Sequence, residues 1–330
     1  VKAHDYYNSF SKWCKEHYDW SFPEEELCFT PGIIPALYQL TETLCNKDEK
    51  VLMNTPAYGY FLHSAEYAGV DVLQSPLKKK PDGTFELDYE NFEQQCANPQ
   101  CKMVFWCNPQ NPTGRMWTEE ELRRIAAIVE KYNLWIVSDE IHCDLIRCGR
   151  KHIPMAKVMT DYPKLITCMA PSKTFNLAGL AFSNIIIRDP VLRERFKERD
   201  KLFGMVNPMS LTAAKAAYDK GGAWHEELKQ YLDANFAFVK DFFDKNLPDA
   251  VMYIPEATYL AWVDLSKCLP DVEDLPDFFA NKAGVLLEGG NSLFVGNAAG
   301  YIRLNLAMPR SILKIGLERM RDTINAHNKH

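Results

Sequence analysis

Between residues 51 and 187, short apolar runs alternate with helical stretches, and this alternation constrains the fold more than any other feature of the chain. Near-continuous apolar strands separated by helices are typical of a parallel sheet whose two faces are both covered. Thr118 and Glu121 form a capping box that predicts a helix running to Asn133. We therefore predict an α/β fold with a mostly parallel sheet sandwiched by helices. The predicted strands are VLMNTP, GVDVLQSPL, CKMVFWCNP, LWIVSDE, KLITCMAPSK and SNIIIRDP.

After Pro190 the pattern changes to long helical stretches, which we predict over 191–203 and roughly over 209–246. From about residue 250, β-rich runs and a closing helix predict a smaller α+β lobe. The first residues begin inside an amphipathic helical pattern, and we expect them to pack near that C-terminal lobe. We divide the chain into an N-terminal remnant (1–30), a large α/β domain (31–245) and a small α+β domain (246–330).

Composition excludes several classes of function. The net charge of −6 argues against nucleic acid as the main partner. The apolar runs are too short to cross a bilayer and no signal peptide is visible, so we expect a cytoplasmic protein without a membrane partner. The ten cysteines form no CxxC pair, which favours free thiols in a reducing compartment over disulfides. The sequence also lacks HExxH, and we predict no metal site.

Polar residues follow three of the predicted strands. Asn111 follows CKMVF, Asp139 and His142 follow LWIV, and Lys173 follows KLITCM. Each has an ordinary alternative: a turn asparagine, a helix cap, a packed core histidine and a solvated loop lysine. Because ligands bind outside the carboxyl ends of parallel strands, the three groups together predict a site at that edge of the sheet.

A further candidate lies upstream, where TPGIIP runs into the helical stretch ALYQLTETL. Gly32 before a helix N-terminus would free the backbone N–H groups of Ile33 and Ile34 to bind an anion such as phosphate. Pro-Gly also marks ordinary turns, so this segment alone does not distinguish the two.

An amine, a carboxylate, an asparagine and a phosphate-binding turn together fit pyridoxal phosphate. Four motifs, NPTG at 111–114, SDEIH at 138–142, SKTFN at 172–176 and Arg303 in YIRLN, resemble the fold-type I pyridoxal-phosphate aminotransferase superfamily in order and spacing. The resemblance covers essentially the whole chain. It is strongest to the MalY/PatB branch of cystathionine β-lyases and related carbon–sulfur lyases.

The resemblance implies a role for each matching residue. Lys173 would bind the cofactor's aldehyde and later remove the substrate's Cα proton. Asp139 would pair with the pyridine nitrogen, and Asn111 would donate to the ring oxygen. His142 stands where aminotransferases usually carry a tyrosine for that oxygen. Tyr58 would stack on the ring, although a core tyrosine beside a turn is the alternative interpretation.

The resemblance also implies which residues contact the substrate and the phosphate. Arg303 would bind the substrate carboxylate with its planar guanidinium. The family usually has an arginine at the position of Ala181 and often a serine at that of Ala170. The resemblance therefore leaves phosphate binding to the Gly32 turn, to Ser172 or to other groups.

The activity implied is a β-lyase that releases thiol, pyruvate and ammonia from cysteine conjugates such as cystathionine. An aminotransferase shares the early steps, and a regulatory protein that retains the cofactor is a third possibility. The family also implies a homodimer with the site at the subunit boundary. We expect several dozen more residues before Val1, contributing to the substrate pocket and to the neighbouring subunit's site.

Overall fold

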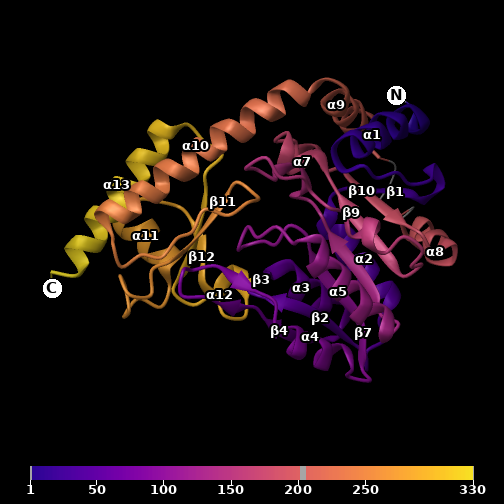
Figure 1. Ribbon diagram of the computed structural model, residues 1–330, viewed down its shortest axis with the longest axis horizontal. Coiled ribbons are helices and arrows are strands. Elements are labelled where there is room, and N and C mark those ends of the chain that lie inside the picture. Colours follow the sequence, from indigo (N-terminus) through magenta and orange to yellow (C-terminus); the bar gives the residue numbers. More distant parts are fainter. Residues whose placement is uncertain (1, 201–205, 330) are drawn as a thin grey trace.

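The computed structural model describes residues 2–200 and 206–329. The chain forms two lobes, which the long helix α10 (Gly222–Asn246) connects along one side of the molecule (Figure 1). The larger lobe contains a sheet of strand order β1-β10-β9-β8-β7-β2-β4, and the smaller one a sheet of order β11-β14-β12. Within the described residues no helix is both long and apolar enough to cross a membrane.

The sheet of the large lobe is mostly parallel, which confirms the predicted fold class. Strands β4, β2, β7, β8 and β9 run in the same direction, whereas β10 and β1 pair antiparallel at one edge. SNIII therefore enters the sheet as an antiparallel strand. The bounds are β1 Leu27–Thr30, β2 Lys50–Thr55, β4 Asp71–Pro76, β7 Cys101–Cys107, β8 Trp135–Asp139, β9 Leu165–Met169 and β10 Ser183–Ile187.

Helices cover both faces of this sheet because its strands are apolar on both sides. In β2, Val51 and Met53 belong to one hydrophobic cluster and Leu52 to another. The first cluster includes helices α2 (Ile33–Leu44), α3 (Gly59–Ala68) and α8 (Pro190–Asp200). The second includes α4 (Tyr89–Cys96), α5 (Glu119–Lys131) and α6 (Met155–Val158). The capping box at Thr118 and Glu121 is present at the start of α5.

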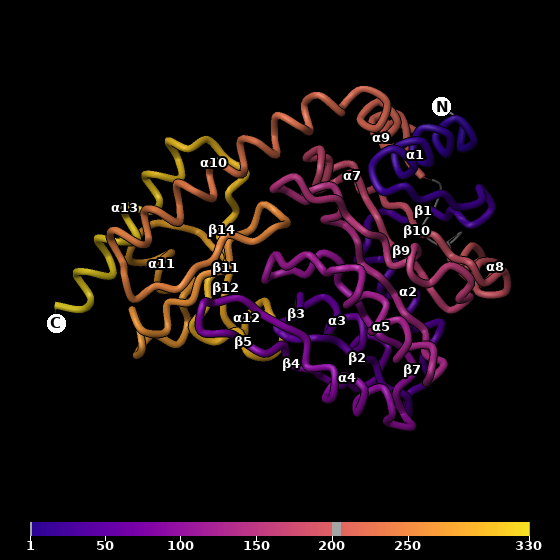
Figure 2. The backbone as a smooth tube through the Cα atoms, viewed as in Figure 1, coloured from indigo at the N-terminus to yellow at the C-terminus, as the bar shows by residue number. Residues whose placement is uncertain are grey.

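The N-terminal segment packs on the large lobe, so the expectation that it lies near the C-terminal lobe was wrong. Helix α1 (Ala3–Tyr18) lies beside α9 (Pro208–Lys220), and β1 adds a strand to the large sheet (Figure 2). The rings of Tyr6 and Phe10 contact Tyr218 of α9, and the Tyr6 hydroxyl donates to Asn184 of β10 at 2.8 Å. The apolar face of α1 is thus buried against elements much later in the sequence.

The predicted helix over 209–246 is two helices, α9 and α10, which meet at Gly221. A Cβ at Gly221 would lie 2.4 Å from the Ala217 carbonyl oxygen and 2.6 Å from the Phe175 ring, so only glycine permits this close approach. Of the predicted helix over 191–203, residues 201–203 lie outside the described part of the chain. Cys101, Cys107, Cys143 and Cys148 carry free thiols.

The small lobe packs helices against an antiparallel sheet. The side chains of Val263, Ile302, Phe243 and Leu317 join the sheet and its helices in one hydrophobic cluster. Two-residue strands β3 (Ala57–Tyr58) and β13 (Phe294–Val295) pair across the two lobes. The remaining bounds are β5 Lys78–Lys79, β6 Phe85–Glu86, β11 Leu260–Asp264, β12 Glu288–Gly289, β14 Tyr301–Asn305, α11 Leu275–Ala283, α12 Gly290–Leu293 and α13 Arg310–His327.

Candidate active site

A cavity of about 830 Å³ lies between the two lobes, at the carboxyl ends of the parallel strands. Its walls come from the segment before α2, from the ends of β7, β8 and β9, and from β12, β14 and α13 of the small lobe. Every site residue predicted from the sequence lines it: Gly32, Ile33, Ile34, Tyr58, Asn111, Asp139, His142, Ser172, Lys173 and Arg303.

The order of the strands explains why these residues meet. Strands β7, β8 and β9 are neighbours in the sheet, so their carboxyl ends are adjacent. Asp139 is the last residue of β8, and Asn111 lies four residues beyond the end of β7. Lys173 lies in the short helix α7 (Pro171–Thr174), which begins two residues after β9. The three side chains therefore reach one cavity from three consecutive strands.

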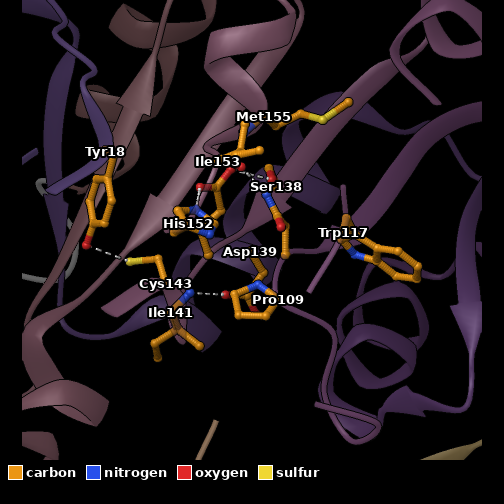
Figure 3. A network of polar contacts seen from close by, with 12 residues as sticks. Tyr18, Pro109, Trp117, Ser138, Asp139, Ile141, Cys143, His152, Ile153 and Met155 are labelled. Atoms are coloured by element: carbon orange, nitrogen blue, oxygen red, sulfur yellow. Dashed lines mark hydrogen bonds and ion pairs between the residues drawn. The ribbon is translucent and has the colours of Figure 1, made fainter. Parts of the chain in front are cut away.

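Asp139 is a buried carboxyl group at the base of the cavity. Its Oδ1 accepts a hydrogen bond from the Ile141 backbone N–H at 3.2 Å (Figure 3). The pKa of Asp139 is raised to about 7, chiefly by burial and also by Glu140, against the lowering effects of the Ile141 hydrogen bond and Lys173. A carboxyl group with this environment is stabilised in its charged form by any cation that enters the cavity.

Lys173 and His142 both have depressed pKa values. Burial lowers the pKa of Lys173, and Arg303 lowers it further, while Asp139 and Glu288 oppose the shift. Burial, followed by Lys173 and Arg303, lowers the pKa of His142 to about 3, so its imidazole is neutral. The buried His142 Nδ1 has no hydrogen-bond partner among the described residues.

A buried polar network supports the strand end that carries Asp139. The Glu140 carboxylate accepts hydrogen bonds from the Ser138 hydroxyl at 2.8 Å and the Met155 N–H at 2.9 Å, and its Oε2 lies 2.6 Å from His152 Nε2. Figure 3 shows Ser138, His152 and Met155 of this network near Asp139. Glu140 does not line the cavity, and its contacts hold the β8 end in place.

Arg303 enters the cavity from the central strand of the small sheet. Its Nη1 donates to Asn111 Oδ1 at 2.9 Å, which connects the two lobes, and its Nη2 pairs with the Glu288 carboxylate. Tyr58 lies on the cavity wall half-buried, and burial raises the pKa of its hydroxyl to about 12. The hydroxyl of Tyr58 is therefore protonated at neutral pH.

The backbone at Gly32 forms the turn that the sequence predicts before α2. Gly32 is the N-cap residue of α2 with φ of 117°, a conformation that favours glycine. Thr30 Oγ1 donates to the Gly32 carbonyl oxygen at 2.9 Å and fixes the turn. The first helical residues, Ile33 and Ile34, line the cavity together with Ser172. Backbone N–H groups at a helix start favour a bound anion.

Among the cavity residues that were not predicted from the sequence are Tyr259, Glu288 and Arg319. The Tyr259 ring meets that of His142 edge-on at 5.9 Å between centroids. Glu288 precedes a glycine pair in an ordinary β-rich run, and Arg319 lies on a helix with other charged residues. Because neither Glu288 nor Arg319 follows a strand of the large sheet, the pattern of polar residues at strand ends gave no indication of them.

The fold and this arrangement of lysine and carboxylate define an enzyme of the aminotransferase type. The model of the family "Aminotransferase class I and II" matches residues 3–320, and the chain belongs to that family. Cystathionine β-lyase PatB of Bacillus subtilis is 35% identical over 317 residues, 95% of this chain and 81% of PatB. Protein MalY of Escherichia coli is 30% identical over 98% of this chain and 83% of MalY.

Solved structures give the same result for the fold. The PLP-bound C–S lyase of Staphylococcus hominis superimposes with a TM-score of 0.94 and 42% identity, covering 98% of this chain and 83% of that one. The predicted fold type and the resemblance to the MalY/PatB branch are thereby confirmed.

Proposed function

We propose that this chain is a pyridoxal-phosphate-dependent carbon–sulfur β-lyase that converts cysteine conjugates such as cystathionine to a thiol, pyruvate and ammonia. The similarity to PatB and to the Staphylococcus hominis lyase supports this class of reaction. The observation that carries the proposal is that Lys173 and Asp139 line one cavity from neighbouring strands. An amino-acid conjugate is a small-molecule substrate, and a cavity of about 830 Å³ accommodates both it and the cofactor.

The residues on the cavity fit pyridoxal phosphate. Burial raises the pKa of Asp139 and Lys173 offsets this only in part, so a protonated pyridine nitrogen would stabilise the Asp139 carboxylate. Lys173 supplies an amine whose lowered pKa favours its neutral form. The unpartnered His142 Nδ1 and the Asn111 amide are polar groups for the ring oxygen. Tyr58 supplies an aromatic face for the ring.

The phosphate would be held by the turn before α2. Gly32 allows the chain to enter the helix so that the N–H groups of Ile33 and Ile34 remain available, and Ser172 adds a hydroxyl. Ala181, where the family usually has an arginine, also lines the cavity and supplies no charge. We therefore propose that these neutral donors bind the phosphate, alone or with other groups of the cavity.

The chemistry of the elimination divides between the cofactor and the protein. When bound, pyridoxal phosphate supplies an aldehyde that links to an amine and a cationic ring that accepts the electrons of a breaking bond. Lys173 Nζ takes the proton from the substrate's Cα. Arg303 binds the α-carboxylate and thereby orients the Cα–H bond toward Lys173. Asp139 would pair in its ionised form with the cationic ring, and neutral His142 adds no charge.

An assay without a keto-acid acceptor tests the proposal. Purified protein with cystathionine alone should release pyruvate and a thiol, and Lys173→Ala should abolish both this turnover and the imine absorbance. Lys151→Ala, an exposed lysine outside the cavity, is the matched control. A requirement for a keto acid would instead identify an aminotransferase, which returns the proton to a different carbon. A protein with neither activity that still binds a partner would support the regulatory alternative.

The cellular location, the oligomeric state, the residue roles and the domain boundary belong to the same proposal. We place the protein in the cytoplasm as a homodimer with the site at the subunit boundary. The roles of the cavity residues and the domain boundary at residues 245 and 246 also belong to the proposal, with 1–30 now assigned to the large domain. Sedimentation equilibrium of the purified chain should give twice the monomer mass, and a monomer mass at micromolar concentration would contradict the dimer.

A further inference from the structure

We propose that Glu288 competes with the substrate for Arg303: it pairs with the guanidinium before substrate binds and is displaced by the α-carboxylate of an amino-acid substrate. The inference rests on the proposed function, because it takes Arg303 as the carboxylate-binding residue. Glu288 thereby contributes to specificity, since a ligand without a carboxylate gains nothing from displacing it.

The pairing of Glu288 with Arg303 is fixed by the backbone. In the small sheet, Glu288 of β12 lies directly opposite Arg303 of β14, and Gly289 lies opposite Ile302. A Cβ at Gly289 would lie 2.4 Å from the Tyr301 carbonyl oxygen, so the glycine allows β12 to approach β14 closely. Directly opposite residues of antiparallel strands have neighbouring side chains. The contact therefore follows from strand register.

Both edges by which the Arg303 guanidinium can hold a carboxylate at two points include Nη2, the nitrogen that Glu288 contacts. Nη1 donates to Asn111 Oδ1 at 2.9 Å, and Nη2 donates to the Glu288 carboxylate. Nε is buried and has no partner within the described residues, and the guanidinium carbon lies 5.0 Å from the centroid of the Phe294 ring. A carboxylate that binds an arginine at two points needs two adjacent N–H groups. An incoming carboxylate that binds at two points therefore competes with the Glu288 carboxylate for Nη2.

The two partners differ in their freedom to move. The Arg303 side chain is 9% exposed, whereas that of Glu288 is 53% exposed. Glu288 can swing into water without losing hydration, but Arg303 cannot leave the cavity wall. Because the Glu288 carboxylate is half exposed, it regains hydration when it leaves, and an arriving carboxylate that offers the same ion pair can replace it. The exchange keeps the buried guanidinium paired at every stage.

Equilibrium binding of propionate to the cofactor-loaded protein tests the inference independently of turnover. Propionate carries the carboxylate but has no amine or sulfur to react, and propionamide is its uncharged counterpart. Isothermal titration calorimetry would compare wild type with Glu288→Gln, which keeps the shape and removes the charge. Glu318→Gln, on α13 and paired with Lys314, makes the same charge change at a residue that does not line the cavity. Arg303→Lys keeps the charge and loses the planar pair of donors.

We expect Glu288→Gln to bind propionate at least fivefold more tightly than wild type, Glu318→Gln to stay within twofold, and propionamide to be unaffected by either change. Arg303→Lys should weaken propionate binding. Unchanged or weaker propionate binding by Glu288→Gln would overturn the proposal, as would an Arg303→Lys variant that binds like wild type. A protein that shows the expected binding but releases no thiol would refute the lyase function alone.

Discussion

Thr174 Oγ1 donates a hydrogen bond to Asp144 Oδ2 at 2.9 Å, and this bond joins the helix that carries Lys173 to the segment that follows His142. Asp144 is buried in the short helix η2 (Cys143–Leu145). Its other oxygen accepts from the Trp13 indole N–H at 2.9 Å and from the Tyr18 hydroxyl, both on α1. One buried carboxylate thus ties three segments together next to the site.

Replacing Thr174 should measure the strength of this connection. Thr174→Val keeps the shape of the side chain and removes a hydrogen bond to a buried charge, so we expect a loss of about 1–3 kcal/mol in the free energy of unfolding. Urea denaturation would measure it. Thr160→Val, at an exposed position, should change the value by less than about 0.5 kcal/mol. Equal effects of the two changes would contradict the assignment.

The environment of Asp139 predicts a pH dependence in the cofactor-free protein. Because the folded-state pKa is about 7 against an ordinary 3.8, the folded chain holds a proton that the unfolded chain has lost between these values. The contribution of Asp139 to stability should therefore fall as pH rises from about 4 to 7. Asp139→Asn should remove this fall and be more stable than wild type at pH 8, while binding pyridoxal phosphate more weakly. Thermal unfolding across pH would measure the first effect and absorbance titration the second.

An exposed carboxylate is the control for the pH dependence of Asp139. Asp241→Asn changes an exposed carboxylate paired with Lys245 and should leave the pH dependence as in wild type. In the cofactor-loaded protein the cationic ring should keep Asp139 ionised, so the fall between pH 4 and 7 should disappear. Its persistence in the loaded protein would argue against a contact between Asp139 and the ring nitrogen.

His142 contributes the opposite slope over an overlapping pH range, from about 3 to 6.5. Its folded-state pKa is about 3, below the ordinary 6.5, so the unfolded chain takes up a proton first as pH falls. The stability due to neutral His142 is present above pH 6.5 and is lost as pH falls toward 3. Between pH 6.5 and 4.5, wild type should lose about 2–3 kcal/mol more than His142→Asn. Urea unfolding at the two pH values would measure this, with exposed His63→Asn behaving as wild type.

Two glycine substitutions should have opposite effects on stability. Gly289→Ala places a methyl group 2.4 Å from the Tyr301 carbonyl oxygen and must separate β12 from β14, at a cost of about 1–3 kcal/mol. Gly316→Ala, within α13, meets nothing within 4 Å and should stabilise the protein by up to about 1 kcal/mol through helix propensity. The melting temperatures of the two variants would test this prediction. A stabilising Gly289→Ala would show that β12 does not approach β14 closely.

The strand ends were predictable because each depends only on residues close to it in the sequence. Apolar runs ending in Asn111, Asp139 and Lys173 indicated strands followed by polar groups, and parallel strands bring such ends to one edge. The positions of Tyr58 and Arg303 came from family resemblance, because neither follows from periodicity. Both line the cavity with the others.

The sequence by itself determined the parallel sheet and the edge at which the cavity lies, since both depend on local periodicity and on residues adjacent to each strand. Only the tertiary structure decided that α1 packs on α9 and that Glu288 pairs with Arg303. These contacts join segments whose individual patterns do not identify their partners. Burial of complementary apolar faces selects the first contact, and the register of antiparallel strands selects the second.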